Sequence, residues 1–207
     1  GMRFWFTNDR AHALDQCSET GPRYNVRLPG YQVDRAVLDE HVLATAVAEG
    51  ADAAASIADI IATLTTFRDS GRPLVAYNAA YDLTLLHHEA LRHGLEPFVP
   101  GVVIDPLIID KAVDRYRKGK RTLTVACEVY GVTLEGAHEA SADAIAAGRV
   151  ALALARAYPE LTELSLEELH SRQQSWQREQ AESFAEWKRR NGDLGFEAEV
   201  GWPVRVG

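Results

Sequence analysis

Short apolar runs alternate with amphipathic segments between residues 52 and 157, and this alternation constrains the fold of the 207-residue chain more than any other feature. The two apolar runs are residues 73–77 and 102–104. Each follows a turn that contains glycine and proline, which is typical of a buried strand. Strands that alternate with helices indicate an α/β fold in which helices pack on a sheet.

Amphipathic helices account for most of the remaining chain. Apolar residues recur at helical spacing, and glycines such as Gly71, Gly94 and Gly131 mark several expected helix ends. The predicted helices span residues 36–50, 52–69, 81–93, 107–116, 123–130, 137–157 and 162–190.

The N-terminal part has a weaker pattern. Residues 3–6, 11–17 and 24–28 favour three short strands in a small antiparallel meander. We therefore expect one α/β domain over residues 2–160. A helical C-terminal extension over residues 161–207 is expected to pack on the same domain.

The composition sets limits on the function. The chain is 46% hydrophobic and 25% charged, as ordinary globular proteins are. Its net charge of −8 argues against a general nucleic-acid coat, because affinity for phosphates depends on Lys and Arg. The same charge is compatible with a nuclease that carries acidic metal ligands. Neither a long apolar run nor a signal peptide is visible, so we expect a cytoplasmic protein with no membrane partner.

Polar residues follow the two predicted buried strands. Asn78 comes after the first strand, and Asp82 follows in the first turn of a helix, where the helix dipole favours a carboxylate. Asp105 ends the second strand before a proline, either as a metal ligand or as an ordinary turn residue. Later in the chain, His138 precedes Asp143 by five residues at the start of another helix. A histidine base and carboxylate metal ligands are parts of many hydrolase sites.

A basic segment separates these motifs. It places five of the chain's 22 positive charges between residues 115 and 121, although the chain as a whole is acidic. Clustered cations can bind a phosphate backbone, and a solvated loop without a ligand is the alternative. The candidate nucleic-acid contacts are Asn78, Arg115, Arg117, Lys118, Lys120 and Arg121.

The order of these motifs resembles that of the DEDDh exonucleases, the DnaQ-like superfamily that includes ribonuclease T and oligoribonuclease. The resemblance covers residues 24–157 and rests on Asn78-Ala-Ala-Tyr-Asp82 and on His138-x-x-x-x-Asp143. It implies a ribonuclease H-like mixed sheet flanked by helices. The Trp-Gln-x-Glu-Gln-Ala-x-Ser-Phe segment that starts at Trp176 and the Gly-Trp-Pro ending are similar to an actinobacterial branch of the superfamily.

The resemblance implies hydrolysis of phosphodiester bonds at the 3′ end of single-stranded DNA or RNA. In the superfamily, four carboxylates hold two Mg²⁺ or Mn²⁺ ions, and a histidine activates the attacking water. Asp82 matches the carboxylate of the second motif. His138 and Asp143 match the third motif, which makes His138 the expected general base.

The first motif of the superfamily, Asp-x-Glu-Thr on the first strand, has no direct match. Asp15 and Glu19 are four residues apart, which is about 13 Å on a strand that rises about 3.3 Å per residue. Alternatively, residues 3–6 form the first strand and place Thr7 and Asp9 at the motif, with one carboxylate fewer. The third alternative is that the motif is absent.

An incomplete first motif leaves more than one function open. A catalytically weak or inactive homologue that binds nucleic acid or protein is the main alternative, because divalent ions need carboxylates to offset their dehydration. The aromatic stripe on the helix at 162–190 favours a helix that lies on the domain. A surface from Trp176 to Trp187 that binds a polymerase or another protein is the remaining alternative.

Overall fold

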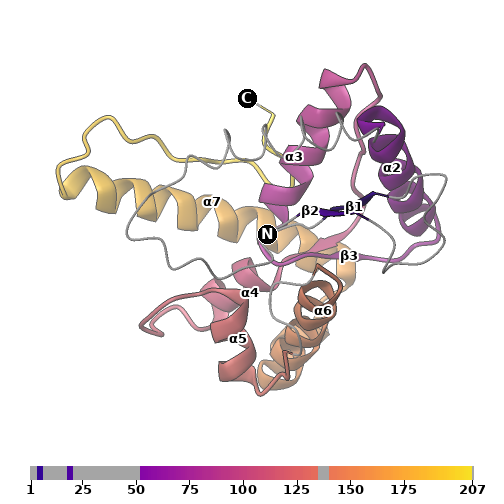
Figure 1. Cartoon of the computed structure of the whole chain (residues 1–207). Coiled ribbons are helices and arrows are strands. Elements are labelled where there is room, and N and C mark those ends of the chain that lie inside the picture. The colour runs from indigo at the N-terminus through magenta and orange to yellow at the C-terminus, as the bar shows by residue number, and fades with distance from the viewer. Residues whose placement is uncertain (1–3, 7–17, 21–51, 135–139, 207) are drawn as a thin grey trace.

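Helices dominate the part of the chain that the computed structural model describes, which comprises residues 4–6, 18–20, 52–134 and 140–206 (Figure 1). Within these ranges, no helix is both long and apolar enough to cross a bilayer. In chain order the elements are β1 (Phe4–Phe6), β2 (Ser18–Thr20), α2 (Ala53–Asp69), β3 (Leu74–Val75), α3 (Ala79–Arg92), β4 (Val103–Ile104), α4 (Pro106–Val113), α5 (Leu123–Tyr130), α6 (Ala140–Ala157), the 3-10 helix η2 (Pro159–Glu163) and α7 (Leu166–Arg190).

The strands form two separate pairs in the described residues. β1 and β2 run antiparallel, with Phe4 opposite Thr20. β3 and β4 run parallel, with Leu74 opposite Val103, and α3 forms the crossover that parallel neighbours require. The described chain therefore combines helices with a parallel strand pair, as an α/β fold does. The predicted mixed sheet is not continuous in this part of the chain, since its parallel and antiparallel pairs are separate.

The helices agree closely with the sequence prediction. α5 has the predicted bounds, and α2 begins just after Asp52, whose carboxylate accepts a hydrogen bond from the Ala55 N–H at 3.1 Å. α4 ends three residues earlier than predicted. The chain turns there because the Arg117 N–H donates to the Asp114 carbonyl at 3.2 Å, which brings the basic segment back toward α4.

Several N-terminal predictions remain untested. The expected strands at 11–17 and 24–28 and the expected helix at 36–50 lie outside the described residues. The strand expected at 3–6 corresponds to β1.

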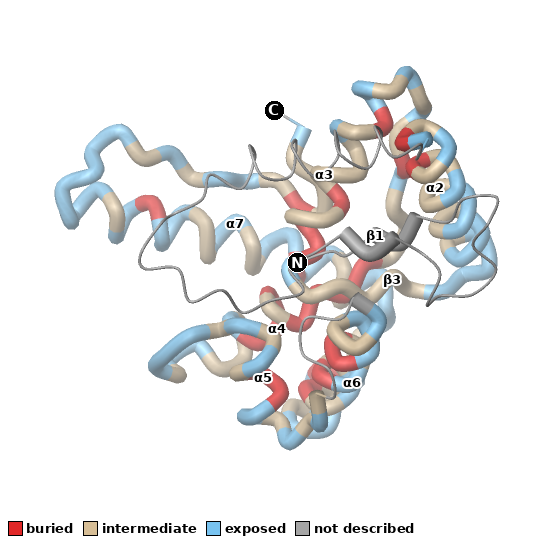
Figure 2. Tube along the Cα trace, viewed as in Figure 1, coloured by how far each residue is buried: buried red, intermediate tan, exposed pale blue. Residues whose placement is uncertain are grey.

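Two hydrophobic clusters lie on opposite faces of β4. Val103 and Ile104 are neighbours in a strand, so their side chains point in opposite directions. Ile104 packs with residues of α4, α5 and α6, whereas Val103 packs with residues of α3, α4 and the C-terminal tail. Trp176 of α7 contacts both clusters. Figure 2 shows the buried segments concentrated where α3, α4 and α7 converge and along α6.

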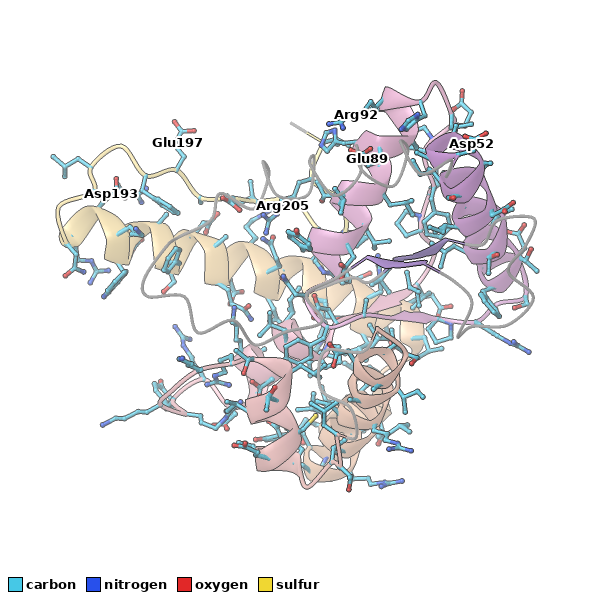
Figure 3. All side chains as sticks on the ribbon, viewed as in Figure 1. Asp52, Glu89, Arg92, Asp193, Glu197 and Arg205 are labelled. Atoms are coloured by element: carbon cyan, nitrogen blue, oxygen red, sulfur yellow. The ribbon has the colours of Figure 1, made fainter. Side chains whose placement is uncertain are left out.

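The C-terminal tail, residues 191–206, returns along α7 to reach α3 (Figure 1). The Gln177 side chain of α7 donates to the Glu199 carbonyl at 2.8 Å, and the Arg205 N–H donates to the Thr84 hydroxyl of α3 at 2.9 Å. Figure 3 shows Arg205 beside α3, whereas Asp193 lies at the opposite end of the tail. α7 itself packs on α4 and β4. The C-terminal segment thus contacts the elements that follow β3 and β4. Both strands were predicted to be buried, and β4 is, whereas β3 is only half-buried.

Candidate functional site

β3 and β4 bring two polar residues to the carboxyl-terminal end of their sheet. Asn78 follows β3 and Asp105 follows β4, and parallel strands end on the same side. The Asp105 carboxylate accepts hydrogen bonds from the backbone N–H groups of Asn78 and Ala79, each at 2.9 Å. It also accepts from the Leu107 N–H at 3.0 Å and so caps α4. One side chain therefore joins the starts of α3 and α4.

The environment of Asp105 favours a structural role. The residue is 1% exposed. Burial raises the pKa of its carboxyl, and the hydrogen bonds from the three backbone N–H groups oppose that rise. Because both oxygens accept from backbone donors, the geometry favours the turn interpretation of Asp105 over the metal-ligand interpretation.

The start of α3 depends on this carboxylate. Asn78 adopts the left-handed conformation, with φ 67°, which asparagine tolerates better than most residues. Its side chain makes no capping hydrogen bond, so Asp105 supplies the cap from the next strand. Asp82 lies in the first turn of α3, as predicted, and is half-buried. The helix dipole favours a carboxylate at this position.

The third-motif aspartate lies at the start of α6. Asp143 is in the first turn of this helix and is half-buried. Burial first, and then the charge of Asp143, raise the pKa of the Cys127 thiol, which places this carboxylate near α5. Asp82 and Asp143 each have further polar or electrostatic partners. His138 lies outside the described residues.

Of the three first-motif candidates, the described residues include Glu19 alone. Glu19 lies in β2, opposite Trp5 of β1, whereas Asp9 and Asp15 fall outside the described ranges.

The described residues do not assemble a complete metal site. Nowhere among them do three His, Cys, Asp or Glu side chains gather into a group that could hold an ion. Asp82 and Asp143 are oxygen donors, the type that Mg²⁺ and Mn²⁺ prefer. By themselves they are too few for the two-ion site that the resemblance implies.

The basic segment folds around Asp110 of α4. Arg117 Nη2 donates to the Asp110 carboxylate at 2.6 Å, and Arg121 Nη1 donates to it at 2.9 Å. The Tyr130 hydroxyl also donates to it, at 2.6 Å. Complete burial raises the pKa of this carboxyl, but the three donors outweigh burial and hold the pKa below its ordinary value.

This network divides the five cations into two groups. The side chains of Arg117 and Arg121 are 14% and 13% exposed, because they hold the loop against α4. Arg115, Lys118 and Lys120 are exposed. Contact with nucleic acid remains a prediction for all five, and only the exposed three face solvent within this segment.

A cavity of about 230 Å³ lies beside the strand ends. Its walls come from the start of α3, from α4, from α7 and from the tail, and they include Asn78, Asp105, Lys111, Gln180, Phe184 and Trp202. Asn78, a predicted contact residue, therefore borders a hollow that the C-terminal segment helps to build.

Sequence reasoning missed two buried polar residues that shape this region, Asp110 and Gln173. Both are 0% exposed. Gln173 stands between Leu169 and Trp176 on the apolar stripe of α7, and a polar residue on such a stripe was the available signal. Asp110 gave no comparable signal, because its cationic partners lie in a segment that looks solvated.

Comparisons with known proteins identify a family. A family model described as exonuclease, RNase_T, matches residues 43–151, more than half of the chain. The matched segment contains Asp82, His138 and Asp143, whereas the first-motif candidates precede it. No curated protein and no solved structure matches the chain.

Proposed function

The chain belongs to the exonuclease family RNase_T, and we propose that it is a 3′–5′ exonuclease that hydrolyses phosphodiester bonds at nucleic-acid 3′ ends. The observation that carries the proposal is the family match, because residues 43–151 include both motifs. The local structure supports it, since Asp82 and Asp143 each lie half-buried in the first turn of a helix.

The proposal includes a ribonuclease H-like sheet. Leu74 and Ala76 donate from β3 toward β4, at 2.9 and 3.1 Å. Val75 lies between them, so its backbone groups point toward the opposite edge of β3. A first strand that pairs at this edge would extend the sheet beyond β3. This arrangement is the one that the family match favours.

The proposed cofactor is a pair of Mg²⁺ or Mn²⁺ ions. Asp82 and Asp143 would hold them, and Asp9, Asp15 and Glu19 are the candidates for the remaining ligands. Bound ions would supply positive charge next to the phosphate that is cleaved. The oxygen chemistry of Asp82 and Asp143 supports this assignment.

His138 is the proposed general base. It would accept the proton of the attacking water, a task suited to an imidazole with an ordinary pKa of about 6.5. The hydrolysis rate should therefore fall as the pH drops below that value, because the protonated ring has no lone pair to offer.

The exposed cations of the basic segment are the proposed contacts to the substrate backbone. Arg115, Lys118 and Lys120 face solvent, while Arg117 and Arg121 fix the shape of the loop. Asn78 is the proposed contact at the end of β3. Such contacts bind single-stranded DNA or RNA without regard to sequence.

The alternative is a catalytically weak or inactive homologue that binds nucleic acid or protein. Two observations favour it. Among the described residues no three potential ligands come together, and the first-motif candidates precede the segment that the family model matches.

Trimming of labelled oligonucleotides tests the proposal. Single-stranded DNA and RNA, labelled at either end, would be incubated with Mn²⁺ and the wild type or the variants Asp82→Asn, Asp143→Asn and His138→Gln. Asp52→Asn is the matched control, because Asp52 also lies at a helix start but caps α2, and asparagine caps equally well.

We expect a ladder of shortened products from the 5′-labelled strand and early release of label from the 3′-labelled strand. The three site variants should abolish both, and Asp52→Asn should retain both. Absence of trimming by the wild type, or trimming that survives all three site variants, would exclude the proposed activity. Oligonucleotide binding without trimming would favour the alternative.

A further inference from the structure

The buried Gln173 of α7 binds the outer edge of β4. Its Nε2 donates to the Val103 carbonyl at 3.0 Å, and its Oε1 accepts from the Asp105 N–H at 2.6 Å. His170, one turn earlier, accepts from the Val103 N–H at 3.0 Å. Since β3 occupies the other edge of β4, side chains of α7 take the place of a further strand.

Gln173 thereby holds Asp105, the residue whose side chain caps α3. The backbone of Asp105 is bound to Gln173, and its carboxylate is bound to the N–H groups of Asn78 and Ala79. Asp82 lies in the turn that these two residues begin. The bonds from the Asp105 N–H and from the Ala79 N–H are buried, and the bond from the Asn78 N–H is part-buried. Low polarity strengthens hydrogen bonds in buried places.

The tail closes over the same junction. Trp202 is 7% exposed and packs in one cluster with Ala79 and Ala80 at the start of α3. Its ring lies 4.9 Å from the ring of His170, centre to centre. The C-terminal segment therefore contacts both β4, through His170, and the start of α3, through Trp202.

Simple packing does not explain an amide at position 173. A Leu or Met side chain would fill a comparable volume on the apolar stripe, while a buried amide is tolerated only when its donors and acceptor are satisfied. Here the amide is satisfied by the backbone on either side of Ile104.

We propose that Gln173 is a positioning residue for Asp82, which it orients by holding Asp105 and through it the first turn of α3. The inference rests on the proposed role of Asp82 as a metal ligand. It means that the C-terminal segment, which lies outside the family match, takes part in building the site.

The variant Gln173→Met tests this proposal, and Gln180→Met is its matched control. Gln180 lies two turns later on α7 and lines the same cavity as Asn78, but its amide donates to the Ile108 carbonyl of α4 at 3.0 Å and not to the backbone of β4 or α3. Both variants lose an amide that binds backbone, so a general loosening of α7 would affect both.

Two readouts separate positioning from general stability. The first is the Mn²⁺ affinity, measured by calorimetry without nucleic acid. The second is the hydrogen-exchange rate of the Asn78 and Ala79 amides in metal-free protein, measured by NMR. We expect Gln173→Met to weaken Mn²⁺ binding about tenfold, at the lower end of the effects of residues that orient metal ligands. The two amides should exchange about tenfold faster.

Gln180→Met should leave both readouts unchanged. Equal effects of the two variants, or no effect of Gln173→Met on either readout, would overturn the proposal. If the wild type binds no Mn²⁺, the proposed metal site fails, and the exchange rates alone decide whether Gln173 sets the start of α3. If Gln173→Met does not fold, Asp105→Asn takes its place, and the same changes are expected because one acceptor for the two amides is removed.

Discussion

Two carboxylates of α4, Asp105 at its N-cap and Asp110 within the helix, are both buried, yet they are stabilised in different ways. Asp105 accepts from three backbone N–H groups and joins the starts of two helices. Asp110 accepts from Arg117, Arg121 and Tyr130 and fixes a loop. Backbone donors cannot leave their positions, whereas guanidinium groups belong to flexible side chains. Asp105 therefore defines geometry beside the candidate site, and Asp110 defines which cations reach solvent.

Removal of Asp110 should have the largest effect on stability. Asp110→Ala leaves two poorly exposed guanidinium groups without their carboxylate, and breaking a buried ion pair costs about 3–5 kcal/mol. Urea unfolding measures this free energy. Asp114→Ala is the control, since the Asp114 carboxylate is 30% exposed and pairs with Arg117, and its loss should cost less than about 1 kcal/mol. Equal costs for the two variants would contradict the network.

Removal of Asp105 should cost somewhat less. Asp105→Ala leaves the N–H groups of Asn78 and Ala79 without this acceptor. The loss should be about 1–3 kcal/mol for the buried Ala79 donor and less for the part-buried Asn78 donor. Asp105→Asn keeps one acceptor oxygen and should lose about half as much, measured by the same urea titration. A larger loss for Asn than for Ala would contradict the capping role.

The pH dependence of the two substitutions should have opposite signs. The pKa of Asp105 is raised above its ordinary value of 3.8, so between 3.8 and the raised value the folded protein binds more protons than the unfolded chain. Its contribution to stability therefore falls as pH rises through this window. The pKa of Asp110 is lowered, so its contribution is present above 3.8 and is lost as pH falls toward the lowered value.

Unfolding free energies of Asp105→Asn and Asp110→Asn, measured against wild type from acidic to neutral pH, test these signs. The cost of Asp105→Asn should shrink as pH rises, and the cost of Asp110→Asn should grow. Parallel curves for the two variants would show that the two carboxyls titrate alike.

The smallest effect concerns the exposed cations and leaves stability unchanged. The affinity for single strands falls with salt, and a plot of log K against log salt concentration has a slope of about −0.7 for each phosphate that a cation neutralises. Replacing Lys118 and Lys120 by Gln should therefore make this slope shallower by about 0.7 for each phosphate contact that is lost. Fluorescence anisotropy at several salt concentrations measures this slope. Arg156→Gln, an exposed change on α6, is the control and should leave the slope unaltered. An effect of Arg156→Gln equal to that of the lysine changes would contradict the proposed contact between the basic segment and the substrate.

The sequence predicted the local elements well and the long-range polar contacts poorly. Apolar spacing and glycine positions predict α2, α3 and α5, the strands β3 and β4, and the helix-start positions of Asp82 and Asp143. These signals lie within a few residues of one another, so they can be recognised without knowledge of the tertiary structure. The predicted burial is correct for β4 and wrong for β3, which is half-buried.

The interactions that shape the site join distant parts of the chain. Gln173 binds the backbone of Val103 and Asp105, about 70 residues earlier in the chain, and the residue spacing on α7 does not predict this partner. Arg117 and Lys118 are adjacent cations of one segment, and only the position of Asp110 separates the buried one from the exposed one. Patterns of residue type indicate which side chains can be buried, but not which buried groups meet.

Calorimetric titration of Mn²⁺ into the wild type, Asp82→Asn and Asp143→Asn tests the proposed metal site without any knowledge of the substrate. We expect the wild type to bind two ions and each substitution to weaken or remove binding. The absence of Mn²⁺ binding to the wild type, or equal binding to all three proteins, would contradict the proposed metal site.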